Sequence, residues 1–312
     1  MRRLALSCAF ALAACNPAAV QAPTQADGAH FLAPADLGEF FDCLRVRGQT
    51  IVAAHRGGPE RGYAENSIET FAHTISLAPA LLEIDIAQTS DAVLVLMHDD
   101  TLERTTTGEG PVDELSLAAF QTLSLEDETG AALNAHPPTL RQALDWADGK
   151  TILELDVKRG VSYEDVLAEV RAADAMGRVV FITYSAGAAL RVHRLAPEIM
   201  ISTSIESQAD LAELERGGVD LTRILAWTGI EEPNAALNIT LARRGVEAMF
   251  GTLGGRDSWD QRFAREGEDQ YAAFAETGLQ LISTDRTLAA ARALDAADGV
   301  DGIGALQCVG VR

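Results

Sequence analysis

Short apolar runs alternate with amphipathic stretches along most of the chain. The apolar runs have the length of buried strands, and the stretches between them have apolar residues at the three- and four-residue spacing of a helix face. The predicted strands are 50–54, 81–86, 151–157, 179–184, 199–205, 224–228, 246–252 and 279–284. The predicted helices of the later part are 163–176, 186–195, 209–216, 234–244 and 260–277. Eight strands that alternate with helices are the number that closes a TIM-type (β/α)8 barrel, so we expect this α/β fold.

Three further segments are expected around this barrel. Residues 36–44 have their apolar side chains on one helical face, which predicts a helix that plugs the base. A ninth apolar run, 93–97, is expected to extend the second strand as a hairpin and to bring His98 over the rim. A polar, Gly-terminated loop follows at 102–108.

Ionisable side chains gather where the first two predicted strands end. His55 and Arg56 follow the first strand, Glu83 and Asp85 share one face of the second, and His98 follows the hairpin. The carboxyl ends of barrel strands carry the chemistry of this fold, because the strand fixes the backbone while the next loop opens to solvent. Two carboxylates that face inward need a cation, so the cluster predicts a metal site.

Each of these residues also has an ordinary structural explanation. A single histidine after a strand is more often part of the packing than of a reaction, and paired carboxylates occur on solvated strand faces. Asn66 and Glu69 have the spacing of a capping box, so Asn66 is expected to begin the next helix. It is the grouping of two histidines, two carboxylates and an arginine at strand ends that favours a catalytic site.

Four short motifs in this region carry a resemblance to a known family. They are His55-Arg56-Gly57, Glu65-Asn66-Ser67, Glu83-x-Asp85 and His98-Asp99. In order and spacing this series resembles the signature of the glycerophosphodiester phosphodiesterase family, although the family usually has Thr where this chain has Ser67. The resemblance extends from residue 50 to the Ser-Thr-Asp-Arg segment at 283–286, and it includes a Pro-Thr-Leu at 138–140 before a helix at 141–147. It implies a metal-dependent phosphodiesterase on a TIM-type barrel, with a short insertion after the second strand that covers the pocket but leaves a fairly open mouth.

The strand at 151–157 is where the chain departs from the family pattern. Glu154, Asp156 and Lys158 alternate onto one face of this strand. The family has Glu-x-Lys here, whose carboxylate is the third metal ligand and whose lysine contacts phosphate, and counting back from Lys158 matches Asp156 to that ligand. Glu154 remains as a rival ligand or as a buried partner of Lys158, and an ion pair inside the barrel is the purely structural alternative.

The resemblance implies a role for each charged residue of the site. Glu83, Asp85 and Asp156 would bind a divalent cation, and their oxygen ligands suit Ca²⁺ or Mg²⁺ rather than zinc. Arg56 and Lys158 would neutralise the phosphate of a small-molecule phosphodiester, whose charge grows in the transition state.

His55 and His98 would move the protons of the reaction, one as general base and one as general acid, in an order that the sequence leaves open. The implied reaction is the hydrolysis of a glycerophosphodiester to an alcohol and glycerol phosphate. A phospholipase D-like hydrolase of lysolipids or sphingolipids on the same fold is the nearest alternative, which the Asp156-x-Lys158 form keeps open. A binding lipoprotein that has lost turnover is an alternative of another class, although no catalytic position of the motif is missing.

The first residues have the features of a bacterial export signal. Arg2 and Arg3 precede an apolar stretch too short to span a bilayer, and Cys15 follows directly at its end, like the acylated cysteine of a lipobox. We therefore expect residues 1–14 to be a lipoprotein signal peptide, 15–30 a flexible tether and 31–312 the barrel domain. The protein would then be a periplasmic or outer-membrane lipoprotein, held at the membrane only by its lipid. Cleavage after Ala22 would instead give a soluble secreted form.

Composition and charge narrow the range of partners. The chain has 312 residues, of which 47% are hydrophobic, and this suffices for one barrel of ordinary size. Its formal net charge is −21, which argues against nucleic acid because the phosphate backbone would be repelled. A phosphate-bearing substrate is still compatible with this charge, since a local metal, Arg56 and Lys158 can reverse the field inside a pocket.

The four cysteines divide into two pairs. Cys8 leaves with the signal and Cys15 would carry lipid, so that Cys43 and Cys308 remain in a compartment where disulfides persist. A bond between them would tie the segment before the barrel to the tail, and two separate buried thiols are the alternative.

Overall fold

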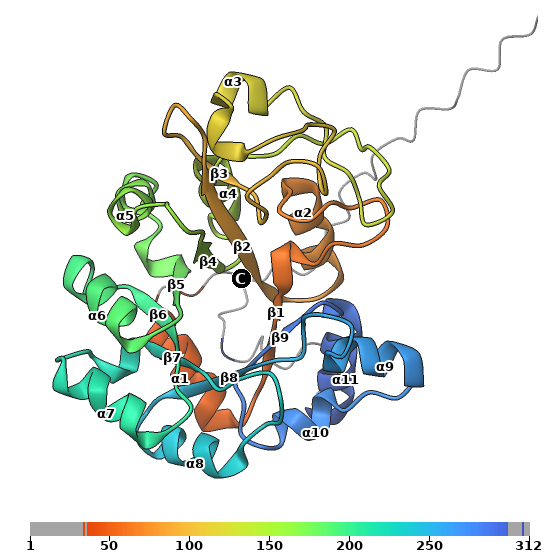
Figure 1. The fold of residues 1–312 in the computed structure, drawn as a ribbon. Helices are drawn as coiled ribbons and strands as arrows, with labels where there is room; N and C mark the ends of the chain where they lie inside the picture. Colours follow the sequence, from red (N-terminus) through yellow and green to blue (C-terminus); the bar gives the residue numbers. More distant parts are fainter. Residues whose placement is uncertain (1–33, 35, 299–307, 309–312) are drawn as a thin grey trace, which may run out of the picture.

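Eight parallel strands form a closed barrel, which confirms the predicted TIM-type (β/α)8 fold (Figure 1). The structure, a computed structural model, describes residues 34, 36–298 and 308, so the predicted signal peptide, Cys15 and the tether lie outside the described residues. β1 pairs with both β9 and β2, with Ala54 in register between Thr284 and Leu82, and this closes the barrel. The barrel strands are β1 (Ile51–Ala54), β2 (Ala80–Gln88), β4 (Leu153–Val157), β5 (Val179–Thr183), β6 (Met200–Ser204), β7 (Ile224–Trp227), β8 (Glu247–Gly251) and β9 (Leu281–Thr284).

Helices surround this ring of strands on the outside (Figure 1). Most of them begin where a Ser, Thr, Asp or Asn side chain accepts a backbone N–H of the first turn, as Ser162 and Ser185 do. The predicted helix 260–277 is two helices, α9 and α10, because Gly267 ends the first with a left-handed φ of 75°. The helices are α1 (Leu37–Arg47), α2 (Ile68–Leu77), α3 (Leu117–Phe120), α4 (Leu140–Ala147), α5 (Tyr163–Ala172), α6 (Ala186–Leu195), α7 (Gln208–Arg216), α8 (Ala235–Arg243), α9 (Trp259–Glu266), α10 (Tyr271–Ala275) and α11 (Thr287–Asp298).

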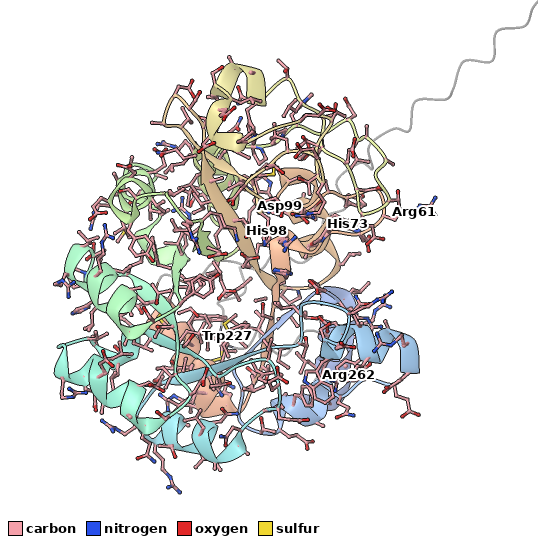
Figure 2. The ribbon with its side chains drawn as sticks, viewed as in Figure 1. Arg61, His73, His98, Asp99, Trp227 and Arg262 are labelled. Atoms are coloured by element: carbon pink, nitrogen blue, oxygen red, sulfur yellow. A yellow bond between two sulfur atoms is a disulfide. The ribbon has the colours of Figure 1, made fainter. Side chains whose placement is uncertain are left out.

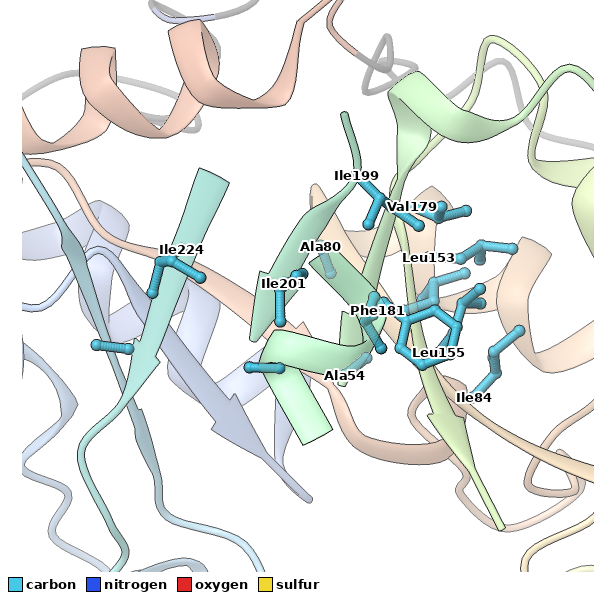
Figure 3. Packing of buried hydrophobic residues seen from close by; sticks show 14 of the residues in the cluster. Ala54, Ala80, Ile84, Leu153, Leu155, Val179, Phe181, Ile199, Ile201 and Ile224 are labelled. Atoms are coloured by element: carbon cyan, nitrogen blue, oxygen red, sulfur yellow. The ribbon is translucent and has the colours of Figure 1, made fainter. Parts of the chain in front are cut away.

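The main hydrophobic core lies between the strands and these helices. Alternate strand residues such as Leu153, Leu155 and Phe181 are fully buried in it (Figure 3). Their neighbours along the strands point the other way, into the barrel. Among the described residues no helix combines the length and the apolar character that crossing a bilayer requires.

The base of the barrel is closed by α1, as the amphipathic segment 36–44 predicts. Leu37, Phe40, Phe41 and Leu44 of this helix are buried in one cluster with inward-facing strand residues. The strand residues of this cluster are Ile51, Ala53, Leu81, Val180, Met200, Leu225, Met249 and Leu281, and Ile152, just before β4, joins them. The base is therefore a packed apolar plug.

Cys43 of α1 forms a disulfide with Cys308, across a Cα–Cα distance of 5.7 Å. The bond joins residues 265 positions apart in the sequence. Of the two alternatives for these cysteines, the structure has the bond rather than two separate thiols.

The insertion after the second strand has a small core of its own. β3 (Leu94–Leu96) pairs with β2 in antiparallel orientation, as predicted for the ninth apolar run. The loop beyond it carries the short 3-10 helix η2 (Val112–Glu114) and α3, and Val112 and Phe120 are buried against Val95. This packing anchors the segment that carries His98.

Candidate active site

Three carboxylates meet at the carboxyl ends of neighbouring strands. Glu83 and Asp85 lie on β2 and Asp156 on β4, with Asp85 and Asp156 paired in register. One ligand atom from each of the three residues lies within 4.8 Å of the others, and all three residues are buried. Burial, together with the charges of Asp85 and Asp156, raises the pKa of Glu83 well above its ordinary value. The structure thus brings together the three residues predicted as metal ligands.

Lys158 neutralises part of this negative charge. Its Nζ lies 2.5 Å from Oδ1 of Asp85 and 2.6 Å from Oδ2 of Asp156. Burial disfavours the charged amine, but the two carboxylates outweigh burial and raise the pKa of Lys158 above its usual value. The lysine therefore stays protonated beside the two ligands, where an ammonium group can also contact a phosphate.

Arg56 approaches the cluster from the loop after β1. Its Nη1 lies 3.0 Å from Oε2 of Glu65, and its Nε lies 3.9 Å from Oδ2 of Asp85. Nε is buried and has no hydrogen-bond partner among the described residues. One guanidinium N–H therefore remains for a ligand, while Glu65 fixes the other side of the group.

The loop that carries His55 and Arg56 is fixed by unusual backbone conformations. Arg56 has a φ of 51°, and its N–H donates to Oε2 of Glu83 at 2.7 Å. Asn66 has a φ of 57°, and its side chain both donates to Asp85 and accepts the Asp85 backbone N–H. The prediction that Asn66 caps the next helix is wrong by one residue, because Ser67 is the N-cap of α2 and the side chain of Asn66 instead holds Asp85.

His55 is paired with a carboxylate from the last strand. Its Nδ1 lies 2.6 Å from Oδ1 of Asp285, which follows β9 and so lies beside β1 in the closed barrel. Burial alone would raise the pKa of Asp285, but the hydrogen bond and charge of His55 bring it below its ordinary value. Asp285, just after the last strand, thus orients the histidine that follows the first strand.

His98 has a similar carboxylate partner. Its Nδ1 lies 2.6 Å from Oδ1 of Asp99, and Figure 2 shows the two residues side by side between the barrel and the insertion. Arg104 of the insertion binds both oxygens of Asp99, and it also binds both oxygens of Glu65 at 2.8 Å each. These bonds lower the pKa of Asp99 and raise that of Arg104. One ionic network thus joins His98 to the loop of Arg56.

Glu154 lies apart from the acidic cluster, although it faces the barrel interior on the same strand as Asp156. It is fully buried, and neither carboxylate oxygen has a hydrogen-bond partner among the described residues. Burial raises its pKa to about 8. Lys158 contacts Asp85 and Asp156, so Glu154 is not its partner, and the geometry favours Asp156 as the third ligand.

Two aromatic residues lie at the carboxyl ends of later strands. Trp227, at the carboxyl end of β7, packs against the apolar plug, and Figure 2 shows it within the ring of strands. Tyr184, just after β5, is exposed at 69%, and burial of its hydroxyl end and Asp156 raise its pKa. No sequence pattern predicts that Tyr184 lies near the site. The same holds for Arg104, because its position in a loop does not indicate the two bidentate contacts with Asp99 and Glu65.

The chemistry of these donors fits a hard divalent cation. Three buried carboxylates carry more negative charge than Lys158 and Arg56 can balance, which is the condition that a divalent ion relieves. Oxygen-only donors without a cysteine or histidine in the cluster suit Mg²⁺ or Ca²⁺.

The known proteins that are similar to this chain include glycerophosphodiester phosphodiesterases. The model of the glycerophosphoryl diester phosphodiesterase family matches residues 55–228. A glycerophosphodiester phosphodiesterase of Caldanaerobacter subterraneus is 28% identical over 49% of this chain and 65% of its own length. A putative one of Bacillus subtilis is 33% identical over 38% of this chain and 49% of its own length. The chain thus spans about half to two thirds of these curated relatives.

Solved structures extend the likeness to the whole barrel. The crystal structure of a glycerophosphoryl diester phosphodiesterase from Parabacteroides distasonis is 31% identical, with a TM-score of 0.78, over 88% of this chain and 97% of that one. A phosphodiesterase of Oleispira antarctica, solved in complex with its product sn-glycerol-3-phosphate, is 20% identical with a TM-score of 0.60, over 80% of this chain and 99% of that one. The family match includes both histidines and all three carboxylates, and it covers more than half of the chain. The chain therefore belongs to the glycerophosphoryl diester phosphodiesterase family, whose members are phosphoric diester hydrolases.

Proposed function

We propose that this protein hydrolyses glycerophosphodiesters to an alcohol and glycerol phosphate, with a divalent cation held by Glu83, Asp85 and Asp156. The observation that carries the proposal is the convergence of three buried carboxylates at the strand ends, together with two histidine–carboxylate pairs in the loops that follow the strands. The product complex of the Oleispira antarctica phosphodiesterase supports glycerol phosphate as a product.

A cation bound by these carboxylates would polarise the phosphorus and neutralise a phosphoryl oxygen, and Mg²⁺ or Ca²⁺ suits the donors. The protein's own cations complete the charge balance. Arg56 directs its unpaired Nε toward the cluster, and Lys158 lies against two of the ligands. Both side chains stabilise the negative charge that develops on the phosphoryl oxygens in the transition state.

The two histidines move the protons. In each, a carboxylate holds Nδ1, so Nε2 is the nitrogen that exchanges a proton with water or the substrate. One takes a proton from the attacking group and the other gives one to the departing alcohol. Their Nδ1 partners fix the imidazole orientation and stabilise the charged form, as a carboxylate does in a catalytic triad.

An assay of a soluble glycerophosphodiester against a micellar lysolipid, each with and without chelator, tests this function. We expect release of glycerol phosphate from the soluble diester, its loss with chelator and its return with Mg²⁺ or Ca²⁺. Turnover of the lysolipid alone would assign the protein to the phospholipase D-like alternative. Binding without turnover of either substrate would indicate the non-catalytic alternative.

We further propose that the protein is exported and is anchored through a lipid on Cys15. The disulfide between Cys43 and Cys308 supports export, since such bonds persist in oxidising compartments. Cys15→Ser should release the protein from the membrane fraction, because acyl chains rather than a protein segment would be the anchor. An unchanged distribution between the membrane and soluble fractions would indicate ordinary secretion.

A further inference from the structure

Behind the His55–Asp285 pair lies a second carboxylate that does not touch the histidine. Asp260, in the first turn of α9, is fully buried. Its Oδ1 accepts the hydroxyl of Tyr271 at 2.6 Å, and its Oδ2 accepts the backbone N–H of Asp285, also at 2.6 Å. The hydroxyl of Thr284 lies 3.0 and 2.9 Å from the two oxygens. Asp260 therefore holds the last residue of β9 and the residue that contacts His55.

Asp285 is fixed at three points by these contacts. Its backbone N–H is held by Asp260, its Oδ2 accepts the N–H of Gly254 at 3.0 Å, and its Oδ1 is left for Nδ1 of His55 at 2.6 Å. A carboxylate with one oxygen and its own peptide held in place has a single direction in which the other oxygen can point. Asp285 therefore fixes the orientation of the His55 imidazole, because Asp285 is itself held by Asp260 and Gly254.

Gly254 and Asp260 belong to one loop, which follows β8. Thr252 at its start donates its backbone N–H to the carbonyl of Ser283 at 2.8 Å, and the N–H of Asp260 donates back to the carbonyl of Thr252 at 3.0 Å. The loop is therefore tied both to β9 and to itself. It forms a clamp, residues 252–260, around the end of β9.

Burying the carboxylate of Asp260 costs free energy of folding, so its presence indicates a role that an apolar side chain could not fill. Burial raises the pKa of Asp260, against the hydrogen bonds from Tyr271 and Asp285 that lower it. Packing alone does not need the charge, since Tyr271 also packs edge-on against Phe263 with the ring centroids 5.0 Å apart. What the carboxylate adds is the capacity to accept on both oxygens at once.

We propose that Asp260 and Tyr271 are positioning residues for His55, which they orient through Asp285. Tyr271 fixes Asp260, Asp260 fixes the peptide of Asp285, and Asp285 fixes the imidazole. The expected effect on turnover rests on the proposed function, but the coupling of these residues to the imidazole does not.

The test compares two kinds of buried carboxylate in the Mg²⁺-loaded protein. Asp260→Asn keeps the shape, but an amide accepts on one side only. It loses either the N–H of Asp285 or the hydroxyl of Tyr271 as a donor, and in the second case the contact remains only with the amide donating to the hydroxyl oxygen. Glu247→Gln is the matched control, because Glu247 is also buried, its pKa is also raised by burial, and its partner Arg45 lies at the opposite end of the barrel. Thermal unfolding of both variants measures their losses of stability.

We expect Asp260→Asn to lower kcat by about 10- to 100-fold with KM within about threefold, since a misplaced catalytic group costs rate rather than binding. Tyr271→Phe, which removes only a hydroxyl, should lower kcat by roughly 3- to 10-fold in the same way. Glu247→Gln should leave kcat of the folded protein unchanged. Equal kcat for Asp260→Asn and Glu247→Gln at similar stability would show that Asp260 is purely structural and would overturn the proposal.

A second measurement is independent of activity. The Nδ1 proton of His55, hydrogen-bonded to Asp285, should give a downfield proton resonance, assigned by its loss in His55→Gln. The resonance should shift in Asp260→Asn and Tyr271→Phe and stay in place in Glu247→Gln. If Asp260→Asn does not fold, Tyr271→Phe decides, and an unshifted resonance in it refutes the coupling. If the parent protein proves inactive on phosphodiesters, the proposed function fails while this resonance still tests the positioning.

Discussion

The two ends of the barrel interior are built on opposite principles. At the base, α1 inserts apolar side chains such as Phe40 and Phe41 among inward-facing strand residues that are also apolar. At the mouth, the same strands turn Glu83, Asp85 and Asp156 inward, and only Lys158 and Arg56 oppose their charge. The change from one end to the other takes only a few residues, since Ile152, just before β4, lies in the plug and Asp156, on β4, lies in the site.

This difference assigns stability to one end and chemistry to the other. Each apolar side chain of the base gains free energy on burial, whereas each carboxylate of the mouth loses hydration that its neighbours only partly replace. We therefore expect changes at the mouth to alter the rate with little loss of stability, and changes at the base to do the reverse.

Removing a histidine at the mouth should have the largest effect on the rate and so tests the contrast between the two ends most strongly. His55→Ala and His98→Ala should each lower kcat by about 10²- to 10⁴-fold while the protein remains folded, because each residue moves a proton. Steady-state kinetics and circular dichroism on the same preparations measure the two effects. Activity within a few fold of the parent in either variant would remove that histidine from the mechanism.

A change at the base should do the opposite. Phe41 is fully buried in the plug, so Phe41→Ala should lower the free energy of unfolding by about 3 to 5 kcal/mol through lost burial and the cavity left behind. The kcat of the folded fraction should not change. Denaturant unfolding and kinetics at a temperature where the variant is folded test this, and a large loss of kcat there would mean that the plug shapes the mouth.

Sequence patterns predict the base and the ligand-bearing strands well, because both depend on local periodicity. The alternation in 151–157 puts Glu154 and Asp156 on the inner face, and the helical spacing of Phe40 and Phe41 identifies the plug. The apolar spacing of 260–277 continues through Gly267 and so predicts one helix, whereas the left-handed φ of Gly267 ends α9 in the structure.

The connections between distant segments are what the sequence does not contain. Arg104 binds Asp99 and also Glu65, which precedes Arg104 by 39 residues. Asp260 accepts the backbone N–H of Asp285, which follows it by 25 residues. Neither link follows from periodicity, because both residues lie in loops or at a helix start where any polar residue is ordinary. Asn66 shows the same limit, since its spacing to Glu69 fits a cap while its side chain is used by Asp85.

Asp156 and Glu154 face the barrel interior on the same strand, and the metal requirement of activity distinguishes which of them is the third ligand. Asp156→Asn removes a charged ligand from a hard cation, so it should raise the Mg²⁺ or Ca²⁺ concentration at half activity by about 10- to 100-fold. Glu154→Gln should change it much less, because Glu154 lies deeper in the barrel and outside the cluster. Metal titrations of activity, checked by calorimetric binding of the metal, distinguish the two. A larger effect of Glu154→Gln would make Glu154 the third ligand.

Glu154 lies between the two ends and gives the smallest but sharpest test of the comparison. Burial alone raises its pKa to about 8, from an ordinary value of 4.5. Between these two pH values the folded protein keeps a proton on Glu154 that the unfolded chain has lost, so the free energy of unfolding falls by about 1.4 kcal/mol for each unit of rising pH. Below pH 4.5 both states hold the proton and this loss disappears.

Glu154→Gln removes the titration with little change of shape. In metal-free protein the variant should match the parent near pH 4.5 and exceed it in free energy of unfolding by about 1 to 2 kcal/mol at pH 6, with a further gain toward pH 8. The difference between the two unfolding curves isolates this residue, because no neighbouring charge contributes to its shift. A difference that stays constant with pH would mean that Glu154 is solvated or paired in solution, and that the apolar half of the barrel ends below it.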